Sequence, residues 1–256
     1  MGSRHLGLIT AAEVDNLKDK LNKLAEICEK SVDVDGLRKL AKEAKPLEYS
    51  LPNFPVCEKI RIAVAKDEAF CFYYSENLRL LERMGAKLLP FSPLRDVKIP
   101  DEADGLYLGG GYPELYAKTL SENTKMLKSV ADAIKKGLPT IAECGGFLYL
   151  NKSLYGFPMV GVLQGDCEYT NSPVRFGYAT LTANKDNLLC AKGESIRAHE
   201  FHYLECRDCG KDFTVTRRRG APYFACFAND NLYAGFPHVH FYSNLNSANR
   251  FYEKCH

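Results

Sequence analysis

The sequence predicts an α/β fold in which a mainly parallel sheet lies between two helical layers, with antiparallel additions toward the C-terminus. Between residue 59 and about residue 150, short apolar runs alternate with amphipathic stretches of helical period, which indicates a parallel sheet covered on both faces. Beyond residue 155 the hydrophobic period changes to two, which is typical of short antiparallel strands. A charged, helix-patterned stretch at residues 11–45 precedes both zones and predicts an N-terminal helical segment.

The N-terminal segment is expected to contain two helices. Residues 34–43 form the second and shorter one, and the first is marked by an apolar stripe of helical spacing. The members of this stripe are Leu17, Leu21, Leu24, Ala25 and Cys28. Because such a stripe needs a surface to pack against, we assign residues 1–55 to a helical linker segment and residues 56–256 to one larger domain.

The elements of the larger domain follow from the same periodicities. Parallel strands are expected over residues 60–65, 87–91, 105–108 and 139–142. Helices are expected over residues 75–84, 120–136 and 244–252. The later, antiparallel strands are expected over residues 178–182, 213–216 and 231–234. Functional groups gather at the carboxyl ends of parallel strands, so the residues that follow the early strands are the first candidates for a site.

Composition restricts the class of protein. With 256 residues, of which 46% are hydrophobic and 26% charged, the chain can bury a full core. The formal charge of +2 and the scattered basic residues give no footprint for nucleic acid or an anionic membrane. Ten cysteines without a signal peptide argue against a secreted disulfide scaffold, and no apolar stretch approaches the ~20 residues of a membrane span. We expect a cytoplasmic protein with no nucleic-acid or membrane partner.

The segment Ala142-Glu143-Cys144-Gly145-Gly146 has the form of a nucleophile elbow with cysteine at the turn. A sharp strand-to-helix turn strains its central residue, so the neighbours two positions before and after must be small. Ala142 and Gly146 meet that demand. A helix that begins near Gly145 would direct its N–H groups toward the sulfur and favour the thiolate. Cys144 is therefore the candidate nucleophile, and the alternative is a buried structural cysteine.

A glycine-rich segment, Gly109, Gly110 and Gly111 with Glu114 shortly after, also follows an expected strand. Consecutive glycines let backbone N–H groups approach a ligand closely, which suits a developing oxyanion or a carboxylate, whereas a simple tight turn is the alternative. Next to Cys144 these glycines favour an oxyanion site that the N–H of Gly145 completes. The chain has no G-x-x-x-x-G-K-[ST] motif, so we expect it to bind no cofactor of its own.

A thiolate nucleophile usually needs an imidazole to take up and return its proton. Two of the six histidines, His5 and His256, lie near the termini. His238 and His240 follow the late strand at residues 231–234, and in a strand both would face the same side. We expect His238 to be the base.

The remaining histidines, His199 and His202, precede Cys206 and Cys209 in an order that would also suit zinc. A closed structural zinc site usually shows a wider gap between its two ligand pairs. We therefore expect no metal site.

Together these motifs resemble the cobyrinate a,c-diamide synthase family. The resemblance rests on the segments 63–70, 72–74 and 77–78, on Gly-Gly-Gly-Tyr-Pro-Glu, Ala-Glu-Cys-Gly-Gly and His-Glu-Phe-His-Tyr, and on residues 3–8. It implies a flavodoxin-like class I glutaminase domain, preceded by a linker, that supplies ammonia by hydrolysing glutamine. It also implies Cys144 as nucleophile, His238 as its activating histidine, and the backbone of Gly109 to Gly111 and Gly145 as oxyanion donors.

Two positions depart from the wider class I pattern. Many such glutaminases carry H-x-E, in which the glutamate orients the histidine, but this chain has His240 at that position. We therefore expect a Cys-His dyad, with His240 at most an orienting neighbour. Many also carry glutamine four residues after the nucleophile, where this chain has Leu148. Glu114 is then a candidate ligand for the α-ammonium of glutamine, although a glutamate after proline is equally often a helix N-terminal residue.

The resemblance also implies partners. An ATP-binding synthetase domain, with ATP and Mg²⁺, would activate the a and c carboxylates of a tetrapyrrole in cobalamin biosynthesis, and this chain would supply its ammonia. Relatives that amidate nickel-sirohydrochlorin or hydrogenobyrinate are the alternative within this chemistry. A non-catalytic glutaminase-like docking partner is the alternative from another class. A homodimer is retained as one assembly of the chain.

Overall fold

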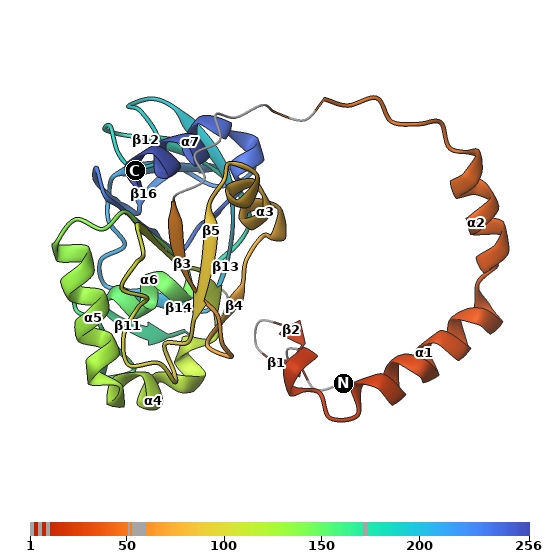
Figure 1. The fold of residues 1–256 in the computed structure, drawn as a ribbon, viewed down its shortest axis with the longest axis horizontal. Helices are drawn as coiled ribbons and strands as arrows, with labels where there is room; N and C mark the ends of the chain where they lie inside the picture. The colour runs from red at the N-terminus through yellow and green to blue at the C-terminus, as the bar shows by residue number, and fades with distance from the viewer. Residues whose placement is uncertain (1–2, 5–6, 9–10, 51, 53–59, 171–173) are drawn as a thin grey trace. The chain divides into compact units, whose positions relative to one another are not determined.

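The computed structural model describes residues 3–4, 7–8, 11–50, 52, 60–170 and 174–256 (Figure 1). The chain forms two compact units, Met1–Asn53 and Phe54–His256. The boundary expected between residues 55 and 56 and the terminal His5 lie outside the described residues. Each unit is described here by itself.

The first unit is mainly helical. A short antiparallel pair, β1 (Ser3–Arg4) and β2 (Gly7–Leu8), is followed by the 3₁₀ turn η1 (Ala11–Glu13). The two helices predicted from the sequence are α1 (Leu17–Ser31) and α2 (Val34–Glu43). Asp33 caps α2 by accepting a hydrogen bond from the N–H of Gly36 at 2.8 Å. No side chain of α1 or α2 is buried, and Leu21 and Leu24 of the apolar stripe are 51% and 49% exposed.

A six-stranded sheet forms the centre of the second unit and is parallel except at one edge. Its order is β17 (Phe227–Ala228), β18 (Leu232–Gly235), β8 (Thr140–Glu143), β6 (Gly105–Leu108), β3 (Arg61–Ala65) and β5 (Lys87–Phe91). Only β17 runs antiparallel to its neighbour. The strand expected at residues 231–234 among the later antiparallel strands is β18, which pairs in parallel with β8, so that expectation is wrong. Every residue of β6, β8 and β18 is buried, as expected for strands covered on both faces.

Alternate residues of these strands enter two separate apolar clusters, one on each face of the sheet. Leu106, Leu108 and Ala142 pack with helices α4 (Ala117–Glu122), α5 (Thr124–Lys135) and α6 (Gly145–Leu150). Tyr107 and Ile141 pack with α3 (Ser75–Arg83) and α7 (Leu245–Lys254) on the other face. These layers are the predicted α/β sandwich (Figure 1).

One predicted helix is wrong in its extent. The sequence suggested a single helix over residues 120–136, but α4 ends at Glu122 and α5 begins at Thr124. Asn123 breaks the helix with φ −81° and ψ 60°. Its side-chain amide donates to the carbonyls of Pro93 and Asp96 at 2.9 and 2.8 Å, and its oxygen caps α5. The loop that Asn123 anchors therefore outweighs helix propensity at this position.

A five-stranded antiparallel sheet packs its inner face into the cluster around Tyr107. Its order is β16 (Tyr223–Ala225), β15 (Phe213–Arg217), β12 (Arg175–Ala183), β13 (Ser195–His202) and β19 (His238–Val239). Strand β19 follows β18 of the parallel sheet after two residues, so it joins the two sheets. β13 was not predicted, although the sequence placed the His-Glu-Phe-His-Tyr motif there.

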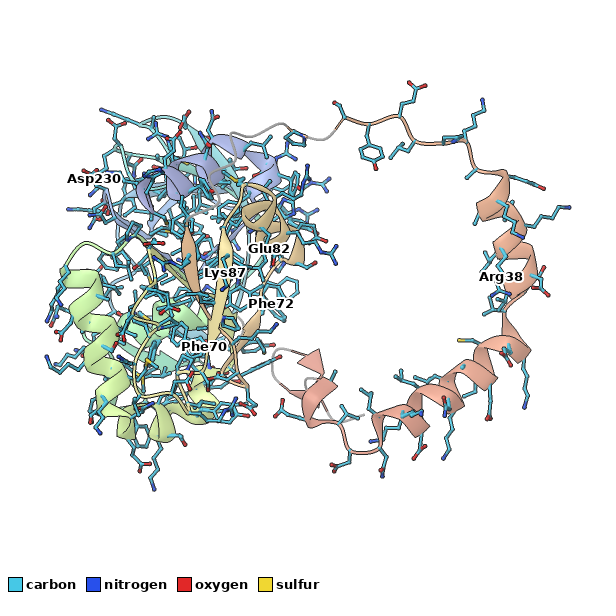
Figure 2. All side chains as sticks on the ribbon, viewed as in Figure 1. Arg38, Phe70, Phe72, Glu82, Lys87 and Asp230 are labelled. Atoms are coloured by element: carbon cyan, nitrogen blue, oxygen red, sulfur yellow. A yellow bond between two sulfur atoms is a disulfide. The ribbon has the colours of Figure 1, made fainter. Side chains whose placement is uncertain are left out.

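Two smaller sheets complete the unit. Four strands pair in the order β10 (Phe157–Pro158), β9 (Ser153–Leu154), β11 (Asp166–Tyr169) and β14 (Leu204–Cys206). A disulfide links Cys167 and Cys206, which face each other across β11 and β14. β4 (Phe70–Phe72) pairs with β7 (Gly110–Gly111). Figure 2 labels two residues of β4, of which Phe70 is buried and Phe72 is 46% exposed.

Among the described residues, no helix has the length and apolar character needed to cross a membrane.

Candidate active site

The strand-to-helix turn at Cys144 has the geometry predicted from the sequence. β8 ends at Glu143, α6 begins at Gly145, and Cys144 between them has φ 47° and ψ −99°. A positive φ is strained for a residue with a side chain and is typical of a nucleophile at such a turn. A Cβ on Gly146 would lie 2.1 Å from the carbonyl oxygen of Leu108, which explains why this position must be glycine.

His238 lies beside Cys144. It is the first residue of β19, is 5% exposed, and interacts through its imidazole with the side chains of Cys144 and Glu143. Gly110 makes room for it, because a Cβ at that position would lie 2.4 Å from His238 Cε1. The ring of Phe72 packs edge-on against the imidazole, with 4.8 Å between the ring centroids. The structure therefore brings together three residues selected from the sequence, Cys144, His238 and Gly110.

The proton affinity of His238 results from two opposing effects. Burial disfavours the imidazolium, but the neighbouring Cys144 and Glu143 side chains favour it more strongly and raise the pKa of His238 to about 10. His199, which pairs with His238 across β13 and β19, has its pKa lowered by burial and then by the charge of His238. The two paired histidines therefore differ, with the pKa of His238 raised and that of His199 lowered.

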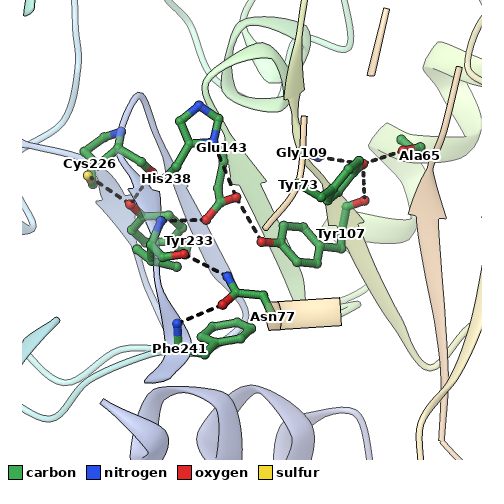
Figure 3. A network of polar contacts seen from close by, with 12 residues as sticks. Ala65, Tyr73, Asn77, Tyr107, Gly109, Glu143, Cys226, Tyr233, His238 and Phe241 are labelled. Carbon is green, nitrogen blue, oxygen red and sulfur yellow. Dashed lines mark hydrogen bonds and ion pairs between the residues drawn. The ribbon is translucent and has the colours of Figure 1, made fainter. Parts of the chain in front are cut away.

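Glu143 is a site residue that the sequence analysis missed. Its Oε2 lies 3.8 Å from His238 Nδ1, and the carboxylate is 1% exposed (Figure 3). The H-x-E pattern places the orienting carboxylate two residues after the histidine, where this chain has His240. In the structure the carboxylate beside His238 is instead that of the residue before Cys144. A signal was present, because a glutamate within an otherwise apolar buried strand is rare unless it has a partner.

Not every backbone N–H group that was expected to bind the oxyanion is available for it. The N–H of Gly109 donates to the Tyr73 hydroxyl at 2.9 Å, so Gly109 is not free to bind an oxyanion. Gly111, with φ 153°, is required to be glycine because a Cβ there would lie 2.2 Å from the Ala69 carbonyl oxygen. The N atom of Gly111 lies 3.1 Å from the Cβ position of Gly145. Gly111 and Gly145 are therefore neighbours beside Cys144, and they remain the candidates together with Gly110.

Glu114 and His240 lie at the edges of this arrangement. Glu114 is half-buried in the 3₁₀ turn η2 (Pro113–Tyr116), directly after Pro113, which approaches Gly145. Burial and, second, the Glu114 carboxylate raise the pKa of Tyr155 to about 12. The carboxylate near His238 Nδ1 belongs to Glu143, whereas the contacts of His240 are with other rings. Its ring packs edge-on against Tyr74, with centroids 5.2 Å apart, and it lines a neighbouring cleft.

That cleft has a volume of about 1180 Å³ and lies beside the site rather than over Cys144. Phe72, which contacts His238, and His240 line it, and Arg197 and Arg218 are among its other lining residues. None of its described lining residues carries a carboxylate. It is an open basic and aromatic surface next to the catalytic residues.

The residues considered as zinc ligands do not form a common site. Cys206 is in the disulfide with Cys167. The buried ring of His202 stacks on Phe236 at 3.7 Å, and its Nδ1 donates to the Leu204 carbonyl at 2.7 Å. Among the described residues, no group of three or more histidine, cysteine or acidic side chains is arranged to hold a metal ion.

The fold and the strand-end cysteine are those expected of a glutamine amidotransferase domain. The structure of PurLQS from Thermotoga maritima has a similar fold, with a TM-score of 0.52 and 15% sequence identity over 77% of this chain and 97% of that one. The family model of the CobB/CobQ-like glutamine amidotransferase domain matches residues 61–245. The chain therefore belongs to the CobB/CobQ-like glutamine amidotransferase family.

Curated relatives extend this similarity beyond the domain. The chain is 41% identical over 98% of its length to a cobyrinate a,c-diamide synthase of Caldanaerobacter subterraneus subsp. tengcongensis, and 36% identical over 99% to one of Thermoplasma volcanium. A third, from Clostridium acetobutylicum, is 39% identical over 95% of this chain. The chain spans 58%, 57% and 56% of these three proteins, respectively.

Proposed function

We propose that this chain is the glutamine-hydrolysing part of a cobyrinate a,c-diamide synthase in cobalamin biosynthesis. The observation that carries the proposal is the strained Cys144, with φ 47°, beside the buried His238. The relatives named cobyrinate a,c-diamide synthase support the choice of acceptor. The synthetase part would use ATP and Mg²⁺ to activate the carboxylates that receive the ammonia.

The proposed reaction begins with attack of the Cys144 thiolate on the side-chain amide carbon of glutamine. The carbonyl oxygen becomes an oxyanion, which the N–H groups of Gly111 and Gly145 would bind. His238 carries the proton needed by the departing ammonia, and a glutamyl thioester remains on Cys144. Water then cleaves the thioester, with His238 accepting its proton, and glutamate leaves. Glu114 would hold the α-ammonium of the substrate.

The experiment compares glutamine hydrolysis by the unchanged chain and by Cys144→Ser. Because the thioester requires the sulfur, the substitution should abolish glutamate release, while circular dichroism should show an intact fold. Retained hydrolysis would refute the assignment of Cys144. A folded, unsubstituted chain that hydrolyses no glutamine, even with a synthetase part present, would favour a non-catalytic role.

A further inference from the structure

Glu143 occupies a position from which it can control His238. As the last residue of β8 it directly precedes the nucleophile, and its side chain reaches the residue pair His238–Val239 of β19. The Oε1 atom accepts a hydrogen bond from the Val239 N–H at 2.9 Å, and Oε2 lies 3.8 Å from His238 Nδ1. One carboxylate therefore contacts both the backbone and the imidazole of the same strand (Figure 3).

The carboxylate is itself held in place. The hydroxyl of Tyr107, a fully buried residue of β6, donates to Oε2 at 2.9 Å. The strand that carries the imidazole is fixed from a third direction by Asn77, which donates to the Val239 carbonyl at 2.8 Å and accepts from the Phe241 N–H at 3.0 Å. β8, β6 and α3 thus define the position of His238 before any substrate binds.

Burial explains why Glu143 lies beside a histidine. An isolated buried carboxylate is strongly unfavourable, so Glu143 needs a positive partner, and the ion pair recorded for it is with His238. The Nδ1 atom of His238 is buried and has no hydrogen-bond partner within normal distance among the described residues. A movement of about 1 Å would close the 3.8 Å separation into a hydrogen bond, and such contacts commonly tighten when substrate binds.

Resting on the function proposed above, we infer that Glu143 is the positioning residue of the glutaminase site. Its carboxylate receives the Nδ1–H of His238, so that the other ring nitrogen, Nε2, is directed to Cys144. Glu143 stabilises the imidazolium and does not touch glutamine. The site is thus a triad of Cys144, His238 and Glu143, in which the orienting carboxylate is supplied by the nucleophile's strand instead of the histidine's. Tyr107 supports this carboxylate.

The direct test is the titration of His238 in the full chain, followed by nuclear magnetic resonance of the imidazole nitrogens. Glu143→Gln keeps the shape and removes the charge, so the pKa of His238 should fall by more than one unit. The groups that share this environment are Cys144, His199, Glu200 and His202, so the titration is repeated in Cys144→Ser. His240→Ala is the matched control, because His240 makes none of the hydrogen bonds described above for Glu143, Tyr107 and Asn77. This variant should leave the pKa of His238 unchanged.

The kinetic test measures glutamate release by the same variants. Glu143→Gln should lower kcat by about 10- to 100-fold, as expected for loss of part of a general acid–base effect, with KM within about twofold. His240→Ala should cost far less. A folded Glu143→Gln protein with an unchanged His238 titration would overturn the inference, whatever its activity. If Glu143→Gln does not fold, Tyr107→Phe decides: a fall in kcat at constant KM supports the inference, and an unchanged kcat overturns it.

The two proposals can fail separately. If Cys144→Ser retains hydrolysis, the proposed nucleophile is wrong, while the His238 titration still tests whether Glu143 controls the imidazole. If Cys144→Ser is inactive and Glu143→Gln leaves both kcat and the titration unchanged, the glutaminase assignment stands and the positioning role does not.

Discussion

At Cys144 the chain holds a cysteine in a backbone conformation that costs on the order of 1–3 kcal/mol. The Cys144 N–H donates to the Gly235 carbonyl at 2.8 Å, and the Cys144 carbonyl accepts from the Leu148 N–H at 2.9 Å. The backbone is therefore fixed on both sides of the strained residue. In this fixed backbone the Cys144 side chain interacts with the imidazole of His238.

His202 is the residue whose titration should be visible in the stability of the fold. Burial lowers its pKa from 6.5 to about 4, so the unfolded chain binds a proton at a higher pH than the folded one. The contribution of His202 to the free energy of unfolding is therefore complete above pH 6.5 and is lost as the pH falls toward 4. The total loss is about 3 kcal/mol. Urea unfolding between pH 7.5 and 4 measures it.

The control for this prediction is His202→Gln, which cannot take up the proton. Carboxylates also titrate in this range, so the relevant quantity is the difference between the two unfolding profiles. The unchanged protein should lose more stability than His202→Gln as the pH falls. Parallel profiles would show that His202 is not buried as a neutral ring.

The sequence predicted those site residues whose role depends on their immediate neighbours in the chain. Cys144 was recognisable because the constraint on its neighbours acts within five consecutive residues. The position of Glu143 at His238 depends on how β19 lies beside β8, a tertiary relation that no local pattern encodes. The occupied N–H of Gly109 was equally inaccessible, because its acceptor, the Tyr73 hydroxyl, is 36 residues away.

At the scale of elements, close approach of backbones positions the site. α6 begins so near β6 that Gly146 touches the Leu108 carbonyl, and the Gly146 N–H donates to the Gly109 carbonyl at 2.9 Å. The short pair β4 and β7 holds Phe72 against His238. These contacts tie the nucleophile's turn to the glycine-rich segment.

Gly146→Ala should therefore disrupt both the fold and the site. The added Cβ would lie 2.1 Å from a backbone oxygen, which cannot move aside as a side chain can. We expect the free energy of unfolding to fall by about 2–3 kcal/mol and glutamine hydrolysis to be largely lost. The matched control is Gly193→Ala, where φ is 84° but no atom lies within 4 Å of the new Cβ. Equal losses in the two variants, measured by chemical denaturation, would contradict the packing argument.

The periodicity of the sequence predicted most helices and all strands of the central sheet except β17, because buried parallel strands and amphipathic helices have distinct patterns. Among the antiparallel strands it predicted only β12 and β15. It did not predict the break at Asn123, since that break depends on carbonyls of the loop at Pro93 and Asp96. β13 was also missed. The alternation of apolar and polar residues along β13 is weak, because the outward-facing residues include His199 and Phe201, which are aromatic.

At the scale of the whole molecule, the chain belongs to its family through the domain at residues 61–245 and is also similar to its relatives in the segment before it. In that segment the apolar side chains Leu21, Leu24 and Ile27 are 51%, 49% and 59% exposed. A helical stripe of this kind is a surface that another protein part can cover.

We expect the isolated chain to hydrolyse glutamine slowly and to perform no ATP-dependent amidation. Addition of the ATP-binding part of a relative, in trans or by fusion, should produce amide synthesis and raise the glutaminase rate, because a partner can order the site. The assay follows glutamate release and tetrapyrrole amidation with and without that part, ATP and magnesium. Amidation by the isolated chain alone would contradict this division of labour.

The seven described cysteines outside the disulfide differ greatly in exposure. This difference should allow the nucleophile to be labelled selectively. Cys28 and Cys71 are exposed, whereas Cys144 is only 6% exposed. Burial raises the pKa of Cys226 and Cys255, which makes their thiols poor nucleophiles at neutral pH. A bulky maleimide should therefore label the two surface thiols first. A small electrophile shaped like glutamine should instead select Cys144, so that counting attached labels by mass spectrometry reports active-site occupancy without a turnover assay.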